Sequence, residues 1–188
     1  MDDMFKIKDL GPPKYFLGLE VHRSVDGILL SQHKYITDIL IDTEMQDCKP
    51  SPTLMEAQCH FDDPSSPILA DPSSYRILVG RLVYFTVTRP DLSFAVNCLS
   101  QHIHEPRQEN LDAALHIVRY LKGTPLHGIS LSSNSNLVLN GYSDSDWASC
   151  PVTRQSTTGY ITLLGSSPLS WKTKKQLTVS CSSAKAEY

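Results

Sequence analysis

The sequence predicts an α+β fold, with strands gathered near its two ends and helices between them. Residues 14–31 contain two apolar runs separated by Asp26 and Gly27, a pairing typical of a β-hairpin. Residues 75–125 carry apolar side chains at helical spacing in three successive segments. Residues 137–179 return to short apolar runs with polar links, which is typical of strands. Segregated strands and helices indicate the α+β class.

Composition is that of an ordinary soluble globular protein, with 188 residues, 40% of them apolar and 20% charged. The net charge of −3 conceals an asymmetry. Residues 1–70 hold 6 Lys and Arg against 12 Asp and Glu, whereas residues 71–188 hold 11 against 8. The basic second part is compatible with a nucleic-acid partner, but its excess of positive charge is small for a nucleic-acid-binding surface.

Cysteine usage and the N-terminus indicate an intracellular protein, cytoplasmic or nuclear and not secreted. The cysteines are odd in number and have no zinc-ligand spacing: Cys48, Cys59, Cys98, Cys150 and Cys181. Reduced thiols are therefore expected. The first residues are charged where a signal peptide needs an apolar core, and no apolar run approaches the ~20 residues of a membrane span. We expect no membrane partner, and the oligomeric state stays open.

The first part of the chain is expected to hold a helix end, a hairpin and a helix. Residues 1–11 resemble a helix stopped by Gly11, residues 14–22 a strand, and residues 27–31 its partner. Ser31 is the expected cap of a helix whose apolar face carries Tyr35, Ile36, Ile39 and Leu40.

Residues 47–74 form an expected irregular, surface-exposed connector. Its prolines are Pro50, Pro52, Pro64, Pro67 and Pro72, and pairs of serines and aspartates accompany them. The connector separates the acidic part of the chain from the basic part.

Three amphipathic helices follow and suggest a small bundle. Their apolar faces are Tyr75, Leu78, Val79, Leu82 and Phe85; Leu92, Ala95, Val96, Leu99 and Ile103; and Leu111, Ala114, Leu115, Val118 and Leu121. Gly123 and Pro125 stop the third. Arg107, Arg119 and Lys122 are candidate phosphate contacts, because such contacts need only a reachable positive charge. The alternative is that each is a solvated position on a helix surface.

The last part is expected to consist mainly of strands. Residues 128–131 form a strand, and three more lie at 138–143, 158–164 and, in part, 169–179. The run 171–175 sets Lys172, Lys174 and Lys175 beside a tryptophan, which suits phosphate contact. An edge strand protected by lysines explains the same residues equally well.

Two carboxylates in this part are candidate metal ligands. Asp144 lies where a strand leaves its apolar run, and Glu187 lies in the first turn of a helix that a serine pair can cap. A strand-borne Asp and a helix-borne Glu can share a divalent cation. Asp146 is the weaker candidate for the same role.

The chain also resembles a known family in several segments that keep one order. GYSDSDWASC, TRQSTTGY, SWKTKKQLTVS and SSAKAEY resemble the opening of the ribonuclease H domain in copia-type retrotransposon Pol polyproteins. FKIKDLGPPKYFLGLEV, GILLSQHKY, YRILVGRLVYFTVTRPDLSFAV and RYLKGT resemble the end of the reverse transcriptase of that family. The resemblance covers nearly the whole chain.

The resemblance implies a division into four parts. Residues 1–46 would be the end of the reverse transcriptase palm with a primer-grip-like hairpin, and residues 47–74 the connector. Residues 75–125 would be a thumb-like helical bundle, and residues 128–188 a truncated ribonuclease H-like antiparallel sheet. The implied partner is an RNA–DNA hybrid or a template–primer duplex.

The resemblance also assigns Asp144 and Glu187 as catalytic carboxylates that bind Mg²⁺. Two-metal hydrolysis needs more oxygen ligands than these two supply. Asp2 and Asp3 are unlike the polymerase aspartate pair, because no apolar strand precedes them. We therefore expect a retrotransposon reverse transcriptase/ribonuclease H fragment that is inactive alone. The alternative is a non-catalytic nucleic-acid-binding module; a secreted interaction protein is disfavoured.

Overall fold

The computed structural model describes residues 11–55, 65–150 and 152–187. The helix end expected at residues 1–10, with Asp2 and Asp3, lies outside this part. The strands and helices follow in the order β1 Tyr15–Phe16, β2 Leu19–Ser24, β3 Gly27–Ser31, α1 His33–Asp42, α2 Ser73–Phe85, the 3₁₀ helix η1 Pro90–Leu92, α3 Ser93–Ser100, α4 Gln108–Gly123, β4 Gly128–Ser132, β5 Leu139–Ser145, β6 Thr157–Leu164, β7 Ser167–Lys175 and α5 Ser183–Glu187. Mixed helices and antiparallel sheets confirm the α+β class.

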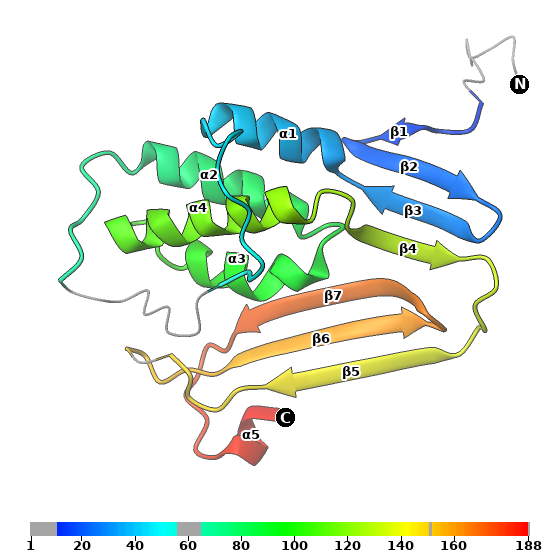
Figure 1. Ribbon diagram of the computed structural model, residues 1–188. Coiled ribbons are helices and arrows are strands. Elements are labelled where there is room, and N and C mark those ends of the chain that lie inside the picture. The colour runs from blue at the N-terminus through cyan, green and yellow to red at the C-terminus, as the bar shows by residue number, and fades with distance from the viewer. Residues whose placement is uncertain (1–10, 56–64, 151, 188) are drawn as a thin grey trace, which may run out of the picture.

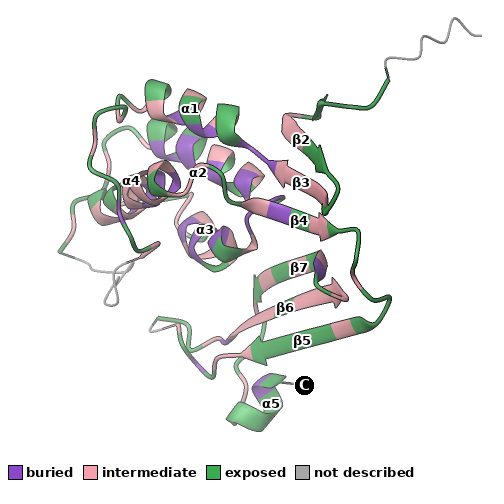
Figure 2. Ribbon diagram, turned by 45° about the vertical axis from the view of Figure 1, so that its right-hand side comes forward, coloured by how far each residue is buried: buried purple, intermediate pink, exposed green. Residues whose placement is uncertain are grey.

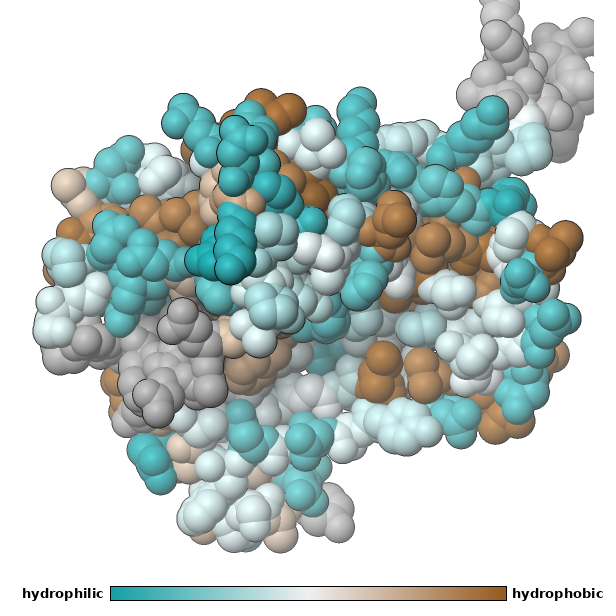
Figure 3. Space-filling view, in the orientation of Figure 1, coloured by the Kyte–Doolittle hydropathy of each residue, from teal (hydrophilic) through white to brown (hydrophobic). Residues whose placement is uncertain are grey.

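The first sheet has the strand order β1–β2–β3–β4, and hydrophobic side chains gather over β2–β4 in Figure 3. The prediction of one strand over residues 14–22 is wrong, because the chain turns at Leu17 and Gly18 between β1 and β2. Both residues have positive φ, 49° and 78°. Glycine is favoured at position 18 because this φ is strained for residues with a Cβ, which would also lie 2.7 Å from the Tyr84 hydroxyl oxygen.

Strand β4 closes the first sheet from far along the chain. It pairs antiparallel with β3, from Gly27 opposite Ser132 to Ser31 opposite Gly128. The boundary that we expected at residue 128 thus falls at the start of a strand that pairs with β3, not with the later strands. The four helices lie in sequence between these two paired strands (Figure 1).

The helices α1–α4 enclose the main hydrophobic core, where the buried residues concentrate (Figure 2). The buried apolar side chains are Ile36, Ile39, Tyr75, Leu78, Val79, Leu82, Phe85, Leu92, Ala95, Val96, Leu99, Ala114, Ile117, Val118 and Leu121. The expected face of α2 is confirmed in full. In α4 the buried face includes Ile117, while Leu111 and Leu115 only border it. Helix α1 belongs to the same core, which makes the bundle larger than the three helices we expected.

Helix α1 has its N-cap one residue later than expected. Its N-cap is Gln32, not Ser31, because Ser31 still pairs in β3. The C-terminus is a Schellman motif, in which the Glu44 amide donates to the Ile41 carbonyl at 3.0 Å and the Met45 amide to the Leu40 carbonyl at 2.8 Å. Glu44 takes the left-handed φ of 55° that this motif needs.

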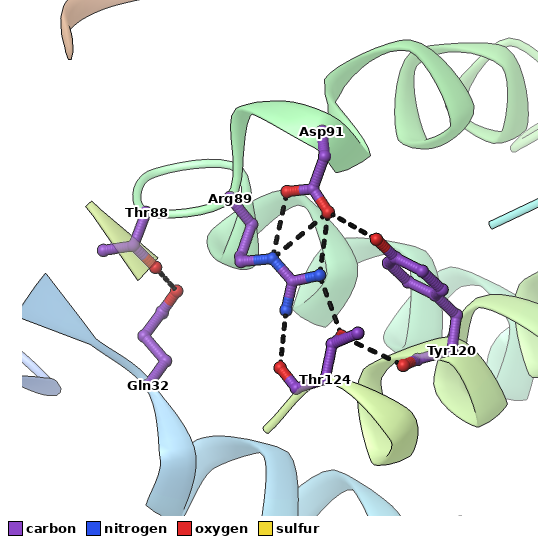
Figure 4. A network of polar contacts seen from close by, with 6 residues as sticks. All are labelled: Gln32, Thr88, Arg89, Asp91, Tyr120 and Thr124. Atoms are coloured by element: carbon purple, nitrogen blue, oxygen red, sulfur yellow. Dashed lines mark hydrogen bonds and ion pairs between the residues drawn. The ribbon is translucent and has the colours of Figure 1, made fainter. Parts of the chain in front are cut away.

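A buried arginine joins η1 to the end of α4 (Figure 4). The Arg89 guanidinium, 2% exposed, donates to Asp91 at 2.8–3.3 Å and to the carbonyl and hydroxyl oxygens of Thr124 at 3.1 and 3.0 Å. The Tyr120 hydroxyl also donates to Asp91, at 3.1 Å. Burial alone would raise the pKa of Asp91, but Arg89 and the Tyr120 hydroxyl outweigh it and hold that pKa below its usual value.

Most of the described residues of the connector are exposed, as expected, but several of them are fixed to α4. Ser51 is 5% exposed, and its hydroxyl lies 3.0 Å from His116 Nε2. Ile68 forms an isolated bridge with Arg107. These contacts fix both described ends of the connector to one helix.

The second sheet, β5–β6–β7, contains the three later strands that the sequence predicts, paired as an antiparallel meander. Its strand β7 lies against α3 and near β4 (Figure 1). Trp171 Nε1 donates to the Thr86 carbonyl at 2.8 Å, and the Ser132 amide donates to Ser167 Oγ at 3.0 Å. None of the described helices has the length and apolar character needed to cross a membrane.

Candidate nucleic-acid interface

Asp144 lies on β5 opposite Gly159, with an exposed side chain. It lines a groove between the η1–α3 segment and the second sheet, together with Tyr142, Phe94 and Asp146. Asp146 is already engaged, because its Oδ1 accepts the Thr157 amide at 2.5 Å. Asp144 is therefore the more available carboxylate of this groove.

Glu187 lies on α5, and the predicted serine cap of this helix is confirmed, since Ser182 Oγ accepts the Lys185 amide at 3.3 Å. The helix is held at the sheet by Gln176, whose Nε2 donates to the Ala186 carbonyl at 2.6 Å and to Ser145 Oγ at 3.3 Å. Successive side chains of a strand point to opposite faces, so Ser145 and Asp144 face opposite sides. The described contacts therefore do not join Glu187 to Asp144, and their shared metal role stays a prediction.

The described residues do not fit a resident Mg²⁺ by themselves. Mg²⁺ requires octahedral coordination by oxygen atoms. Within residues 11–55, 65–150 and 152–187, no group of three or more His, Cys, Asp and Glu side chains could hold a metal ion. Asp144 and Asp146 are the carboxylates of the groove, and one of them binds a backbone amide.

The three candidate cations, Arg119 and Lys122 on α4 and Arg107 at its N-cap, bind backbone carbonyls in the connector or next to it. Arg107 Nη1 donates to the Ser66 carbonyl at 2.6 Å, and Arg119 Nε to the Lys49 carbonyl at 3.2 Å. Lys122 Nζ donates to the carbonyls of Gln46 and Cys48 at 2.5 and 2.6 Å. These contacts give the three side chains a structural task that the sequence did not suggest, and their predicted binding to nucleic acid stays a prediction.

The basic run of β7 divides between the two faces of the second sheet. Trp171 faces the helices, whereas Lys172 and Lys174 are exposed on the other face. Lys175 Nζ lies 3.0 Å from Cys150 Sγ. Burial alone would raise the pKa of the Cys150 thiol, but hydrogen bonds from Lys175 and Thr153 lower it to about 7.

We call the face that carries Lys172 and Lys174 the outer face of the second sheet. Tyr160 lies opposite Lys172 in the β6–β7 register and is 43% exposed. Its hydroxyl lies 3.4 Å from Ser170 Oγ, which confirms that these side chains share a face. The outward positions of the described strands hold Ser, Thr, Gly, Leu, Tyr and Lys, with no carboxylate among them. At one end of this face Gln176 holds α5, which carries Glu187, against the outward side chain of Ser145.

Tyr160 is the residue of this face that sequence reasoning missed. Its place beside Lys172 depends on the pairing register of β6 and β7, which a single sequence does not display. The alternation within 171–175 was visible, and it alone separates Lys172 and Lys174 from the other three residues.

Comparisons with known proteins find one family model and several similar proteins. The family model for reverse transcriptase (RNA-dependent DNA polymerase) matches residues 1–57. The uncharacterized mitochondrial protein AtMg00810 of Arabidopsis thaliana is 44% identical over 188 residues, covering 100% of this chain and 78% of that protein. No solved structure matches the chain significantly.

Retrotransposon polyproteins match over the same length. The retrovirus-related Pol polyprotein from transposon RE1 of Arabidopsis thaliana is 46% identical over 100% of this chain, and that from transposon TNT 1-94 of Nicotiana tabacum is 33% identical over 98%. The chain spans 13% and 14% of these two polyproteins. This chain therefore belongs to the family of copia-type retrotransposon Pol polyproteins and is related to their reverse transcriptase.

Proposed function

We propose that this chain is a nucleic-acid-binding segment of a retrotransposon reverse transcriptase, and that the outer face of the second sheet contacts the phosphate backbone. The observation that carries the proposal is the division of the basic run, which leaves Lys172 and Lys174 exposed beside Tyr160 on a face without strand carboxylates. Family membership supports a nucleic-acid substrate. The partner in this proposal is an RNA–DNA hybrid or a template–primer duplex.

The spacing of the two lysines suits this partner. Side chains two positions apart on a strand are separated by roughly 6.6 Å, from a rise of ~3.3 Å per residue. This is close to the separation of neighbouring phosphates along an extended strand, so both ammonium groups can serve one backbone. An exposed tyrosine beside them supplies a ring on which a base can stack.

We further propose that the chain binds nucleic acid without cleaving it. Two-metal hydrolysis holds ions ~3.5–4 Å apart, and each ion needs several oxygen ligands. Asp144 with Asp146 offers one free carboxylate in the groove, because Asp146 accepts the Thr157 amide. In this proposal the ribonuclease H-like sheet acts as a platform and not as a nuclease.

The test is binding of a labelled oligonucleotide and of an RNA–DNA hybrid, measured by fluorescence anisotropy across a salt series. The variant Lys172→Gln/Lys174→Gln should bind a single strand more weakly and should lower the slope of log K against log salt by about 1.4, which is ~0.7 for each lost phosphate contact. Lys34→Gln/Lys49→Gln is the matched control, since both lysines are exposed. Absence of binding at low salt, or equal slopes for the two double variants, would remove the proposal.

A further inference from the structure

A second groove lies directly beside the one that holds Asp144, between β7 and the helices α2 and α3. Its volume is about 540 Å³. One wall is the stretch 169–173 of β7, and the other is the α3 stripe Ser93, Asn97 and Ser100 with the end of α2. Four residues line both grooves and form the partition between them: Ser93, Trp171, Lys172 and Thr173.

Two polar atoms of this α3–β7 groove are buried without a hydrogen-bond partner. They are Ser93 Oγ and Asn97 Nδ2, which lie one helical turn apart on α3. Leaving a buried polar group unpaired costs ~1–3 kcal/mol, so such groups call for an explanation. Their side chains line an open groove, and a ligand that enters it is one explanation.

The chemistry of the walls selects an acceptor-rich, anionic ligand. Asn97 Nδ2 is a donor, Ser93 has a hydroxyl, and Lys172, whose side chain belongs to the outer face, is the one charged residue among the described residues of the lining. Strand β7 is the last strand of its sheet, so backbone amides on its outer edge are not used by a further strand of that sheet. The lining contains no carboxylate, whereas the neighbouring groove contains Asp144 and Asp146. Charge therefore directs an anion to the α3–β7 groove.

We propose that the α3–β7 groove binds a phosphate-bearing nucleotide, with Ser93 and Asn97 donating to it. The inference rests on the proposed function, because Lys172 belongs to the outer face as well as to the partition. A strand bound on the outer face crosses the edge of β7 at Lys172 and places one nucleotide in the groove. A free nucleotide offers the same phosphate chemistry.

The experiment uses the full chain with Trp147→Phe, which leaves Trp171 as the sole tryptophan of the protein. Its fluorescence reports on the groove, because Trp171 lines it and is fixed to the Thr86 carbonyl. The probes are an oligothymidylate 12-mer, thymidine monophosphate and inorganic phosphate. We expect Ser93→Ala/Asn97→Ala to weaken binding of the oligonucleotide at least tenfold while its melting temperature equals or exceeds that of the parent. Ser133→Ala/Asn134→Ala, the same pair of residue types in an exposed turn, should leave binding unchanged.

The choice of probes distinguishes a bound strand from a free nucleotide, and the choice of variants distinguishes this proposal from the proposed function. Tenfold weakening for the oligonucleotide alone supports a strand, and equal weakening for the monophosphate supports a free nucleotide. If the Ser93→Ala/Asn97→Ala variant binds both the oligonucleotide and the monophosphate with an affinity within twofold of its parent, the groove proposal is wrong. Lys174 does not line the groove, so Lys174→Gln tests the outer face alone. Weaker oligonucleotide binding by Lys174→Gln but not by Ser93→Ala/Asn97→Ala would support the proposed function and contradict the groove proposal. Weaker binding by Ser93→Ala/Asn97→Ala but not by Lys174→Gln would support the groove proposal and contradict the role of the outer face.

Discussion

Removing the Asp91 carboxylate should destabilise the fold far more than removing an exposed one. Arg89 would stay buried with only the two oxygens of Thr124 as acceptors. Breaking a buried pair costs about 3–5 kcal/mol. The Asp91 side chain is 39% exposed, so water replaces part of the loss, and we expect about 2–3 kcal/mol for Asp91→Ala.

Thermal and denaturant unfolding measure this effect. For a chain of this size 1 kcal/mol corresponds to ~2–4 °C, so Tm should fall by about 4–12 °C. Asp42→Ala is the matched control, because Asp42 pairs with Arg81 at the surface and is 60% exposed. It should cost less than about 1 kcal/mol. The double variant Arg89→Met/Asp91→Ala should cost less than the sum of its single changes, because each residue is the partner of the other.

The same residue gives a pH dependence with a definite sign. The pKa of Asp91 is lowered in the folded protein, so its stabilising effect is present above the ordinary aspartate pKa and is lost as pH falls through the lowered value. The difference in unfolding free energy between the parent and Asp91→Asn should therefore shrink in acid. A difference that stays constant down to the lowest pH at which the fold survives, or Asp91→Ala matching Asp42→Ala at neutral pH, would refute the reasoning.

Two further predictions concern local chemistry. Glu44→Gly should stabilise the chain by up to about 1 kcal/mol, seen as a higher Tm, because glycine takes the left-handed φ of this position without strain; a lower Tm than for Glu44→Ala would contradict it. The Cys150 thiol, with its pKa of about 7, should react with iodoacetamide at pH 7.5 faster than in the Lys175→Met variant, in which the pKa should rise; equal rates across a pH series would show that Lys175 has no such effect.

The helices were predictable from sequence because each buries one face against a common core. The periodic spacing of apolar residues reveals such a buried face within each segment of the sequence. In α2 all five buried residues lie at positions that this spacing predicted. The end of α1 was missed, since a Schellman motif usually signals itself by glycine and here uses Glu44.

Features that depend on distant pairing were not predictable. Nothing local in residues 128–132 reveals that they pair with residues 27–31. Nothing local in the sequence marks Arg89 and Asp91 as a network, which forms only because η1 meets the end of α4. In the candidate site, Lys172 and Lys174 were found from the sequence, but Tyr160 and the α3 stripe join them only through tertiary contacts.

The β3–β4 pairing gives the chain the architecture of a domain insertion. Residues 32–127 leave the first sheet at Ser31 and return to it at Gly128, and these two residues lie opposite each other in the ladder. The helical unit could therefore be exchanged between relatives as a cassette, or a circular permutant could join its two ends by a short linker. A cut at residue 126 would instead leave two pieces that need each other, because the fourth strand of the first sheet would belong to the second piece.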